Sequence, residues 1–363
     1  MAKRKDSGES WLKAFNAKAG EQLAVLAAGL GVDVEVTPTG VLALDAALGV
    51  GGWPLGRVVE IFGGENSGKT TLAALAVAAA QAVGRPTLYV DAEHKLDLRW
   101  LQKLGVDLSR MGLSQPSSGE KGFKALRTLM AIGGGLGVID SVTTMTPQAV
   151  IDARDEGGKD PMAAHARLMS QELAALVGGG EVARTQTTLL FLNQTRSKVG
   201  VFYGNPMTTT GGNALRFYSV QRVEFLSAQK VTGATSRGKD VVGVRARAKV
   251  VKNQTAPPFK HAEWTLLGAT GLDRGLDHVE TAIAYGVLRR STKKSPAITF
   301  AEDGYKIGSS LDKAAAAVAA DAGLRAKIRD AVLQAVRDAD VRPAEEGAVV
   351  DEVTVDDDDG GEE

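Results

Sequence analysis

A glycine-rich segment at residues 63–70 constrains this chain more than any other feature of its sequence. It reads Gly-Gly-Glu-Asn-Ser-Gly-Lys-Thr and satisfies the phosphate-loop pattern G-x-x-x-x-G-K-S/T. An apolar strand-like run over 58–62 precedes it, and an Ala- and Leu-rich helical pattern over 71–83 follows it. Glycines let successive backbone N–H groups face one phosphate, and a helix N-terminus adds partial positive charge. The segment therefore predicts a nucleoside triphosphate site; a glycine-rich turn that matches by chance is the alternative.

The predicted nucleotide site extends from the end of the strand into the helix. We expect the ammonium group of Lys69 to reach the β- and γ-phosphates, and the hydroxyl of Thr70 to ligate Mg²⁺. The residues expected to contact the nucleotide here are Gly63, Gly64, Glu65, Asn66, Ser67, Gly68, Lys69, Thr70 and Thr71.

Strands and helices alternate along the chain from residue 57 onward. Apolar strand patterns occupy 57–62, 86–91, 136–140 and 187–193, and helical patterns occupy 69–83, 119–132 and 163–177. This alternation predicts an α/β fold with a mostly parallel, twisted sheet that is covered by helices on both faces. Strand-like stretches over 219–226 and 243–252 would extend the sheet.

The remaining segments suggest four parts. We expect an N-terminal helical arm over 1–34, an ATPase core over 35–271, a small C-terminal α+β domain over 272–340 and an acidic, disordered tail over 341–363. Within the C-terminal domain the patterns predict a helix over 275–288, a hairpin near 297–307 and an Ala-rich helix from 311.

Two carboxylates end predicted strands at the edge where a nucleotide would lie. Asp140 ends the apolar strand 136–140 in the manner of a Walker B element, and we expect it to hold Mg²⁺. Glu93 closely follows the strand 86–91, where a carboxylate can orient or activate the water that attacks the γ-phosphate. Carboxylates after strands also cap helices, and that alternative is open above all for Asp97.

Two predicted loops carry residue types that hold a nucleic-acid backbone. The predicted loop 194–212 lies in a stretch, 193–213, that is rich in Gly, Thr and Asn, and it contains Arg196 and Lys198. Cations meet phosphates, while small polar residues grip a sugar-phosphate chain without reading its bases. A second loop covers about 152–162. A flexible lid over the nucleotide is the alternative function for this region.

The charge distribution agrees with a polyanionic partner. Residues 344–363 contain ten acids and no Lys or Arg, so the rest of the chain has 43 basic and 33 acidic residues. A positive body with an acidic tail suits a DNA-binding protein whose tail competes for the same surface, although a solubilising tail is the alternative. The chain has no cysteine, no apolar run of membrane-spanning length and no secretory signal, so we expect a cytoplasmic protein without disulfides or membrane contact.

Several of these stretches together resemble the bacterial RecA recombinase family. The resemblance covers about residues 35–310 and includes motifs beyond the generic nucleotide site. These are Thr39 to Asp45, the phosphate loop, Asp91 to His94, Gly204 to Pro206, Thr208 to Leu215 and Val250 to Asn253. The family implies a filament of protomers on single-stranded DNA, with ATP between neighbours, homologous pairing with strand exchange, and double-stranded DNA as the second partner.

The resemblance also implies roles for particular residues. Gln194 would sense the γ-phosphate at the root of the main DNA loop, and Trp100 would lie against adenine, with Asp97 nearby in the nucleotide site. Phe217 would contact a neighbouring protomer, and Lys252 would reach the neighbour's triphosphate. The implied DNA-binding residues are Met162, Arg167, Arg196, Ser197, Lys198, Val199, Gly200, Thr208, Thr209, Thr210, Gly211, Gly212 and Asn213.

Three departures from the family pattern bear on activity. The second lysine expected at the protomer boundary is Gln254, so one cation aimed at transition-state charge is missing, and a bound K⁺ could substitute for it. Gly268 replaces a second aromatic near adenine, and Met207 stands where the family often has an acid. The leading hypothesis is a DNA-dependent ATPase of the recombinase type. The alternatives are a nucleotide-switched DNA-binding scaffold or regulatory co-protease with weak turnover and, third, a hexameric helicase.

Overall fold

The computed structural model describes residues 8–22, 24–25, 33–153, 161–197, 207–235, 238–291 and 296–341. The chain divides into two compact units, residues 1–35 and 36–363. The first contains helix α1 (Gly8–Ala19), on which the exposed rings of Trp11 and Phe15 meet edge to face with centroids 6.2 Å apart. Asn16 follows on the same helix and exchanges two hydrogen bonds with the backbone of Ala24, so its amide fastens the segment after the helix.

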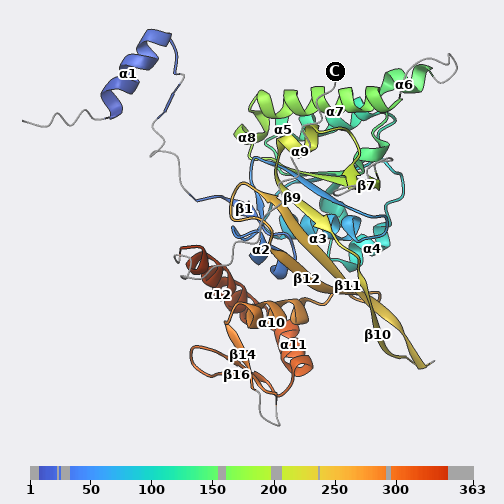
Figure 1. Cartoon of the computed structure of the whole chain (residues 1–363), viewed down its shortest axis with the longest axis vertical. Coiled ribbons are helices and arrows are strands. Elements are labelled where there is room, and N and C mark those ends of the chain that lie inside the picture. Colours follow the sequence, from blue (N-terminus) through green and yellow to red (C-terminus); the bar gives the residue numbers. More distant parts are fainter. Residues whose placement is uncertain are drawn as a thin grey trace, which may run out of the picture. The chain divides into compact units, whose positions relative to one another are not determined.

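The second unit is built on one large sheet (Figure 1). Its strand order is β13-β12-β11-β9-β3-β7-β6-β4-β5, and the strands from β9 to β5 are parallel. The parallel strands are β9 (Ser219–Phe225), β3 (Val58–Gly63), β7 (Thr188–Ser197), β6 (Leu136–Asp140), β4 (Thr87–Asp91) and β5 (Met111–Ser114). Antiparallel strands continue the sheet as β11 (Gly238–Asn253), β12 (His261–Leu267) and β13 (Gly271–Leu272). The predicted α/β class with a mostly parallel sheet is confirmed.

Helices cover both faces of the parallel strands because these strands are apolar on both sides. Leu190 and Leu192 of β7 pack on one face with α3 (Lys69–Ala82) and α4 (Leu98–Lys103). Leu189 and Phe191 pack on the other face with α5 (Gly119–Ala131) and α7 (Pro161–Gly178). This two-sided burial explains the continuous apolar runs in the sequence.

Smaller elements complete the unit. They are α2 (Leu42–Ala47), η2 (Leu108–Arg110), η3 (Val142–Thr144), α6 (Gln148–Asp152), α8 (Glu181–Arg184), α9 (Ala214–Tyr218), and the strands β1 (Val36–Thr37), β2 (Trp53–Pro54) and β8 (Met207–Thr209). Strand β10 (Gln229–Thr235) pairs with β11, and the two form a long ribbon that projects from the sheet (Figure 1). Within the described residues, none of the helices combines the length and apolar character that a bilayer crossing needs.

The C-terminal segment differs from its predicted pattern in two places. Helix α10 (Arg274–Ala284) ends before 288, because Gly286 has a positive φ of 73° and strand β14 (Leu288–Arg290) follows. The predicted hairpin exists as β15 (Ile298–Phe300) and β16 (Lys306–Gly308), with β14 as a third strand. The Ala-rich helix is two helices, α11 (Leu311–Ala320) and α12 (Ala322–Val341), because the side chain of Asp321 between them accepts from the amide of Leu324 and starts the second.

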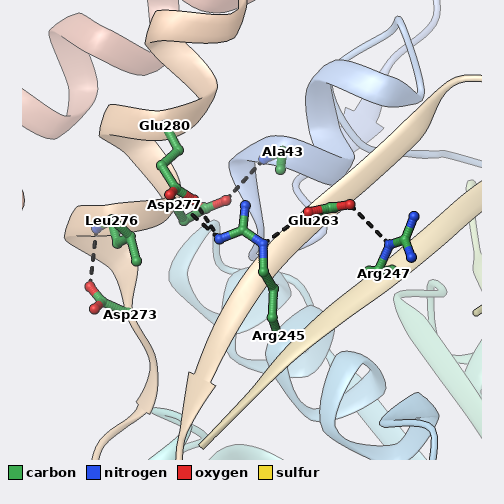
Figure 2. A network of polar contacts seen from close by, with 8 residues as sticks. All are labelled: Ala43, Arg245, Arg247, Glu263, Asp273, Leu276, Asp277 and Glu280. Atoms are coloured by element: carbon green, nitrogen blue, oxygen red, sulfur yellow. Dashed lines mark hydrogen bonds and ion pairs between the residues drawn. The ribbon is translucent and has the colours of Figure 1, made fainter. Parts of the chain in front are cut away.

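Polar contacts join α10 to the sheet and to α2 (Figure 2). Arg245 on β11 pairs with Glu263 on β12 and with Glu280 on α10, at 2.9 and 3.1 Å. The buried carboxylate of Asp277 accepts from the amides of Leu42 and Ala43 at the start of α2, at 2.8 and 3.1 Å. The helix N-terminus of α2 is thus capped by a residue more than two hundred positions away, which sequence analysis could not anticipate.

Candidate functional site

The phosphate-loop segment forms the predicted strand–loop–helix unit. Strand β3 ends at Gly63, and α3 begins at Lys69 after Gly68, whose φ of +104° favours glycine. A Cβ at Gly63 would lie 2.8 Å from Cβ of Phe225, so the close approach of β9 also requires glycine there. Gly64, Glu65 and Asn66 are exposed at the crown of the loop, and Ser67 is half-buried below them.

The ammonium group of Lys69 lies inside this loop. Its Nζ donates to the carbonyl oxygens of Gly63 and Gly64, at 3.1 and 2.7 Å, and is 3.4 Å from Oγ of Ser67. Burial lowers the pKa of Lys69, while the nearby carboxylates of Asp140 and Glu93 oppose that shift. A cation held among backbone oxygens beside backbone amides is suited to a phosphate group.

Asp140 lies beside the start of α3, as the sequence predicts for a Mg²⁺ ligand. Its Oδ2 accepts hydrogen bonds from the hydroxyls of Thr70 and Tyr89, at 2.8 and 2.7 Å. Burial raises the pKa of Asp140, and the two hydroxyl donors partly offset this effect. Burial, together with the charge of Asp140, raises the pKa of Tyr89, so the phenol stays a donor. Two oxygen ligand types meet here, which fits Mg²⁺.

Glu93 lies next to the end of β7. Its Oε1 accepts from Oγ of Ser141 at 2.6 Å and from Nε2 of Gln194 at 3.3 Å, and Oε2 is 3.7 Å from Nζ of Lys95. β4 and β6 are neighbours in the sheet and β7 lies beside β6, so their carboxyl ends bring these groups together. The two residues predicted to act on the γ-phosphate are therefore in contact.

Trp100, which is predicted to lie against adenine, is on α4. The indole Nε1 of Trp100 donates to Oγ1 of Thr71 at 3.1 Å, which places the ring beside the start of α3. Asp97 is the N-cap of α4, and its Oδ1 accepts from the amides of Arg99 and Trp100. The cap role that the sequence offered as an alternative for Asp97 is thus present in the structure, and a nucleotide contact by Asp97 stays a prediction.

The predicted DNA-binding residues begin at β7 and resume at β8. Arg196 and Ser197 are the last residues of β7 and pair in antiparallel register with Thr208 and Met207; Thr195 pairs with Thr209. The chain then turns through Thr210, Gly211 and Gly212, the last two with φ of +92° and +71°. A Cβ at Gly211 would be 3.3 Å from Cγ of Met169 on α7, so the glycine lets the loop lie close to that helix. Lys198, Val199 and Gly200 lie outside the described residues, as do residues 154–160 of the loop predicted over about 152–162.

Other predicted loop residues lie on α7 and at the start of α9. Met162 and Arg167 have exposed side chains on α7, and 74% of Met162 is accessible. Asn213 is the N-cap of α9 and makes no side-chain cap hydrogen bond. Both helices therefore flank the turn at Gly211 and Gly212.

The predicted protomer-contact residues gather around α9. Phe217 is 72% exposed on this helix, as a contact residue must be. Nζ of Lys252 donates to the carbonyls of Arg216 and Phe217, at 2.9 and 3.2 Å. Burial lowers the pKa of Lys252, and the charges of Arg222 and Arg216 add to this effect. Gln254 has an exposed side chain just beyond β11, and its amide donates to the carbonyl of Val220.

Sequence reasoning did not find three residues of the site. Tyr89 lies inside an apolar strand, Ser141 follows Asp140, and Asn193 precedes Gln194. Asn193 is fully buried, and its side-chain oxygen accepts from the amide of Gln194 at 2.9 Å. Ser141 and Asn193 could have been found, because each is a polar residue beside a predicted site residue at the end of a strand. Tyr89 could not, because it gives no such signal.

Comparisons with known proteins agree with the resemblance in the sequence. A sequence profile of the RecA N-terminal domain matches residues 11–273. Protein RecA of Syntrophus aciditrophicus is 43% identical over 260 residues, which are 71% of this chain and 74% of the relative. Protein RecA of Francisella tularensis subsp. novicida is 41% identical over 303 residues, which are 83% of this chain and 81% of the relative. The matched region contains the phosphate loop, Glu93, Asp140 and Gln194.

Proposed function

Because the chain belongs to the RecA family of ATP-binding recombinases, we propose that it is a DNA-dependent ATPase that forms filaments on single-stranded DNA and catalyses homologous pairing and strand exchange. One contact carries the proposal. Nε2 of Gln194 donates to Oε1 of Glu93 across 3.3 Å. Gln194 begins the segment predicted to bind DNA, so the proposed base for hydrolysis touches the root of the proposed DNA loop. This supports a linkage between ATP turnover and DNA binding.

The residues present fit Mg²⁺ and ATP. Lys69 would exchange its carbonyl partners for phosphate oxygens, and the loop amides would hold the same phosphates. Thr70 and Asp140, already joined through a 2.8 Å hydrogen bond, would hold Mg²⁺ through oxygen. The metal would neutralise charge on the β- and γ-phosphates. Trp100 would cover the adenine, which its place beside Thr71 permits.

Glu93 would take a proton from the attacking water. Ser141 and Gln194 both donate to its Oε1, so Oε2, which lies 3.7 Å from Nζ of Lys95, keeps the capacity to accept a proton. Gln194 would change partners when a γ-phosphate is present, because its amide is both donor and acceptor. Such a change would reach the DNA segment through the backbone of β7.

DNA binding would use the segment 194–212, α7 and the start of α9. The glycines at 211 and 212 bring the loop against α7, where Met162 and Arg167 are exposed. Backbone amides and a few cations suit a sugar-phosphate chain of any sequence.

The proposal has three further parts. They are double-stranded DNA as the second partner, the division of the chain into four parts, and a cytoplasmic location.

Filament contacts would form around α9. Phe217 projects from that helix, and Lys252 would be aimed at the triphosphate of the adjoining protomer. Lys252 now donates to two carbonyls at the end of α9, so the lysine is held at the surface that would meet the neighbour. K⁺ would fill the place of the second cation beside Gln254.

Gln254 also favours a second candidate function. With one trans cation missing, a nucleotide-switched DNA-binding scaffold with weak turnover, or a regulatory co-protease, would need only the binding steps. The contact of Glu93 with Gln194 fits a nucleotide switch as well as an ATPase. A measurement of ATP turnover must therefore distinguish the two functions.

The test is ATP hydrolysis by the full chain with and without single-stranded DNA, followed by strand exchange between homologous DNAs. We expect hydrolysis to rise when DNA is added, and exchange to require ATP. Lys69→Ala is the matched inactive control, because a neutral side chain cannot offset the phosphate charge. DNA binding that depends on ATP but proceeds without hydrolysis would select the scaffold instead; no effect of DNA on either property would refute the recombinase proposal.

A further inference from the structure

Four polar side chains form a row across neighbouring strands of the central sheet. Glu60 on β3 is in register with Arg222 on β9, and Arg222 is in register with Lys252 on β11. On the other side, Glu60 is in register with Phe191 on β7, and Asn193 lies two residues farther along that strand. Because alternate residues of a strand face the same side, all four lie on one face of the sheet.

Glu60 is the centre of the row. Its side chain is completely buried, and each carboxylate oxygen has its own donor. Oε1 accepts from Nδ2 of Asn193 at 2.9 Å, and Oε2 accepts from Nε of Arg222 at 2.6 Å. The guanidinium of Arg222 lies 4.6 Å from the ring centroid of Phe62, which limits where it can move. A buried ion pair of this kind keeps its geometry, because losing either partner leaves an uncompensated charge.

One end of the row reaches the nucleotide edge. The side-chain oxygen of Asn193 accepts from the amide of Gln194, and its Nδ2 also donates to the carbonyl of Thr210 at 2.9 Å. Asn193 therefore ties the residue that touches Glu93 to the segment that returns from the predicted DNA loop. A displacement of Gln194 would have to be accommodated by Asn193 and hence by Glu60.

The other end reaches the surface of α9. Lys252, opposite Arg222 in the ladder, donates to the carbonyls of Arg216 and Phe217 in the last turn of that helix. Like charges at opposed positions of an antiparallel strand pair repel each other, so the position of Arg222 affects where the Lys252 side chain is stable. The row therefore connects Gln194 with the helix that exposes Phe217.

We propose that Glu60 is a positioning residue that holds the nucleotide end of β7 and the α9 surface in a single arrangement, so that ATP at the phosphate loop orders the surface that meets the next protomer. The proposal rests on the proposed function, because it assumes that α9 contacts a neighbour. A carboxylate is required in the centre because both of its oxygens accept, one from an amide and one from a cation. An amide in its place would turn one acceptor into a donor and oppose Arg222 or Asn193.

The experiment compares the full-length wild type with three variants: Glu60→Gln, the double variant Glu60→Gln with Arg222→Gln, and Glu263→Gln. In the double variant an amide at 60 accepts from Asn193 and donates to an amide at 222, which restores a continuous, neutral row. Glu263→Gln is the matched control, since Glu263 also pairs with two arginines, Arg245 and Arg247, but lies on β12 outside the row (Figure 2).

Hydrogen exchange is measured with and without ATPγS, and peptides from the phosphate loop are compared with peptides from 214–225. We expect ATPγS to protect both regions in the wild type and in Glu263→Gln. In Glu60→Gln the phosphate loop should stay protected while 214–225 loses its protection, and the double variant should regain it. The dissociation constant for ATPγS should change by less than about twofold in all variants.

Steady-state kinetics supply a second readout that a purely structural role would not move. At saturating ATP and single-stranded DNA, Glu60→Gln should lower kcat on the order of tenfold or more, because misplacement far from the chemistry is enough to do so. KM for ATP should stay near the wild-type value, and kcat should recover in the double variant.

Three results would overturn the proposal. They are wild-type protection at 214–225 in Glu60→Gln, an unrescued loss of protection in both regions, and the absence of any ATPγS effect on 214–225 in the wild type. The exchange measurement needs no DNA and no turnover. A wild type that lacks DNA-stimulated hydrolysis would therefore refute the proposed function, while the exchange pattern would still decide the role of Glu60.

Discussion

The hydroxyl of Tyr89 donates a 2.7 Å hydrogen bond to Oδ2 of Asp140, the same oxygen that accepts from Thr70. Tyr89 is fully buried in β4, one strand away from the carboxylate it binds. Its phenol favours the ionised form of a carboxylate whose pKa is raised by burial. A residue from the apolar interior thus favours the charged form of a predicted metal ligand.

Removing the Tyr89 hydroxyl should weaken the binding of Mg²⁺ at Asp140. In Tyr89→Phe the pKa of Asp140 should rise further, because burial stays and one donor is lost. We expect the Mg²⁺ concentration for half-maximal ATP hydrolysis to rise about tenfold, as is usual when the partner of a metal ligand is removed. Tyr305→Phe, at a tyrosine that is 62% exposed, is the control. An unchanged Mg²⁺ requirement in Tyr89→Phe would separate Asp140 from the metal.

Glu93→Gln should bind ATP and hydrolyse it poorly. The amide nearly keeps the shape of the side chain but cannot take a proton, so kcat should fall by about 100-fold or more. The protein should remain on DNA longer than the wild type, because the ATP-bound state persists. ATP affinity is measured by equilibrium titration and turnover by phosphate release. Loss of ATP binding itself would make Glu93 a structural residue.

Gln254→Lys should raise DNA-dependent hydrolysis if the missing trans cation limits turnover. An oriented cation of this kind contributes on the order of a few kcal/mol to a phosphoryl-transfer transition state. The gain should appear only where filaments form, because the lysine acts across the protomer boundary. Wild-type hydrolysis should also depend on K⁺ more strongly than hydrolysis by the variant. Equal rates and equal K⁺ dependence would place Gln254 away from the triphosphate.

The stability that the junction between α2 and α10 gives to the fold should depend on pH. Burial raises the pKa of Asp277 from 3.8 to about 7, and it raises the pKa of Asp45 on α2 to about 7 as well. A carboxyl group whose pKa is higher in the folded protein than in the unfolded chain stabilises the folded state. This stabilisation is complete at pH values below the pKa of the group in the unfolded chain, and it is lost as pH rises through about 7.

The Tm advantage of the wild type over Asp277→Asn should therefore shrink between pH 5 and pH 8. Thermal unfolding of both proteins across this range measures it. Asp330→Asn, at a carboxylate whose side chain is 74% exposed, is the control and should show a nearly constant difference from the wild type. A difference for Asp277→Asn that is independent of pH would mean that Asp277 does not titrate in this window.

Deleting residues 344–363 should strengthen binding to double-stranded DNA. The deletion removes ten acids and leaves 43 basic against 33 acidic residues, so less negative charge competes with phosphates for the basic surface. The gain should be largest at low salt, where charges are least screened. Fluorescence anisotropy with a labelled duplex at low and moderate salt measures it. Equal affinities throughout would mean that the tail only aids solubility.

The sequence alone was sufficient to predict which residues lie at the nucleotide edge of the sheet. The phosphate loop is a local pattern, and Glu93, Asp140 and Gln194 each follow an apolar strand. Because parallel strands end at the same edge of a sheet, these residues could be expected along one edge. The contact between Glu93 and Gln194 also needs β4, β6 and β7 to be neighbours, which the sequence does not show. Their predicted chemistry stays for the experiments above to test.

Strands without a strong pattern could not be foreseen in the same way. Strand β5 has two exposed residues at the end of the sheet, and β12 lies in a stretch whose alternation is weak. The division at Asp321 was also hidden, because alanines on both sides favour helix and only the cap of α12 marks the break.

The row from Asn193 through Glu60 to Arg222 and the capping of α2 by Asp277 were decided by the tertiary structure. Periodicity shows what each segment is, since it depends on neighbours within a few positions. Which buried polar groups become partners depends on strand order and register, here β7 beside β3 and β3 beside β9, and on where α10 meets α2. A single sequence carries no separate local signal for those pairings, because each joins residues more than one hundred positions apart and is fixed only when the whole core packs.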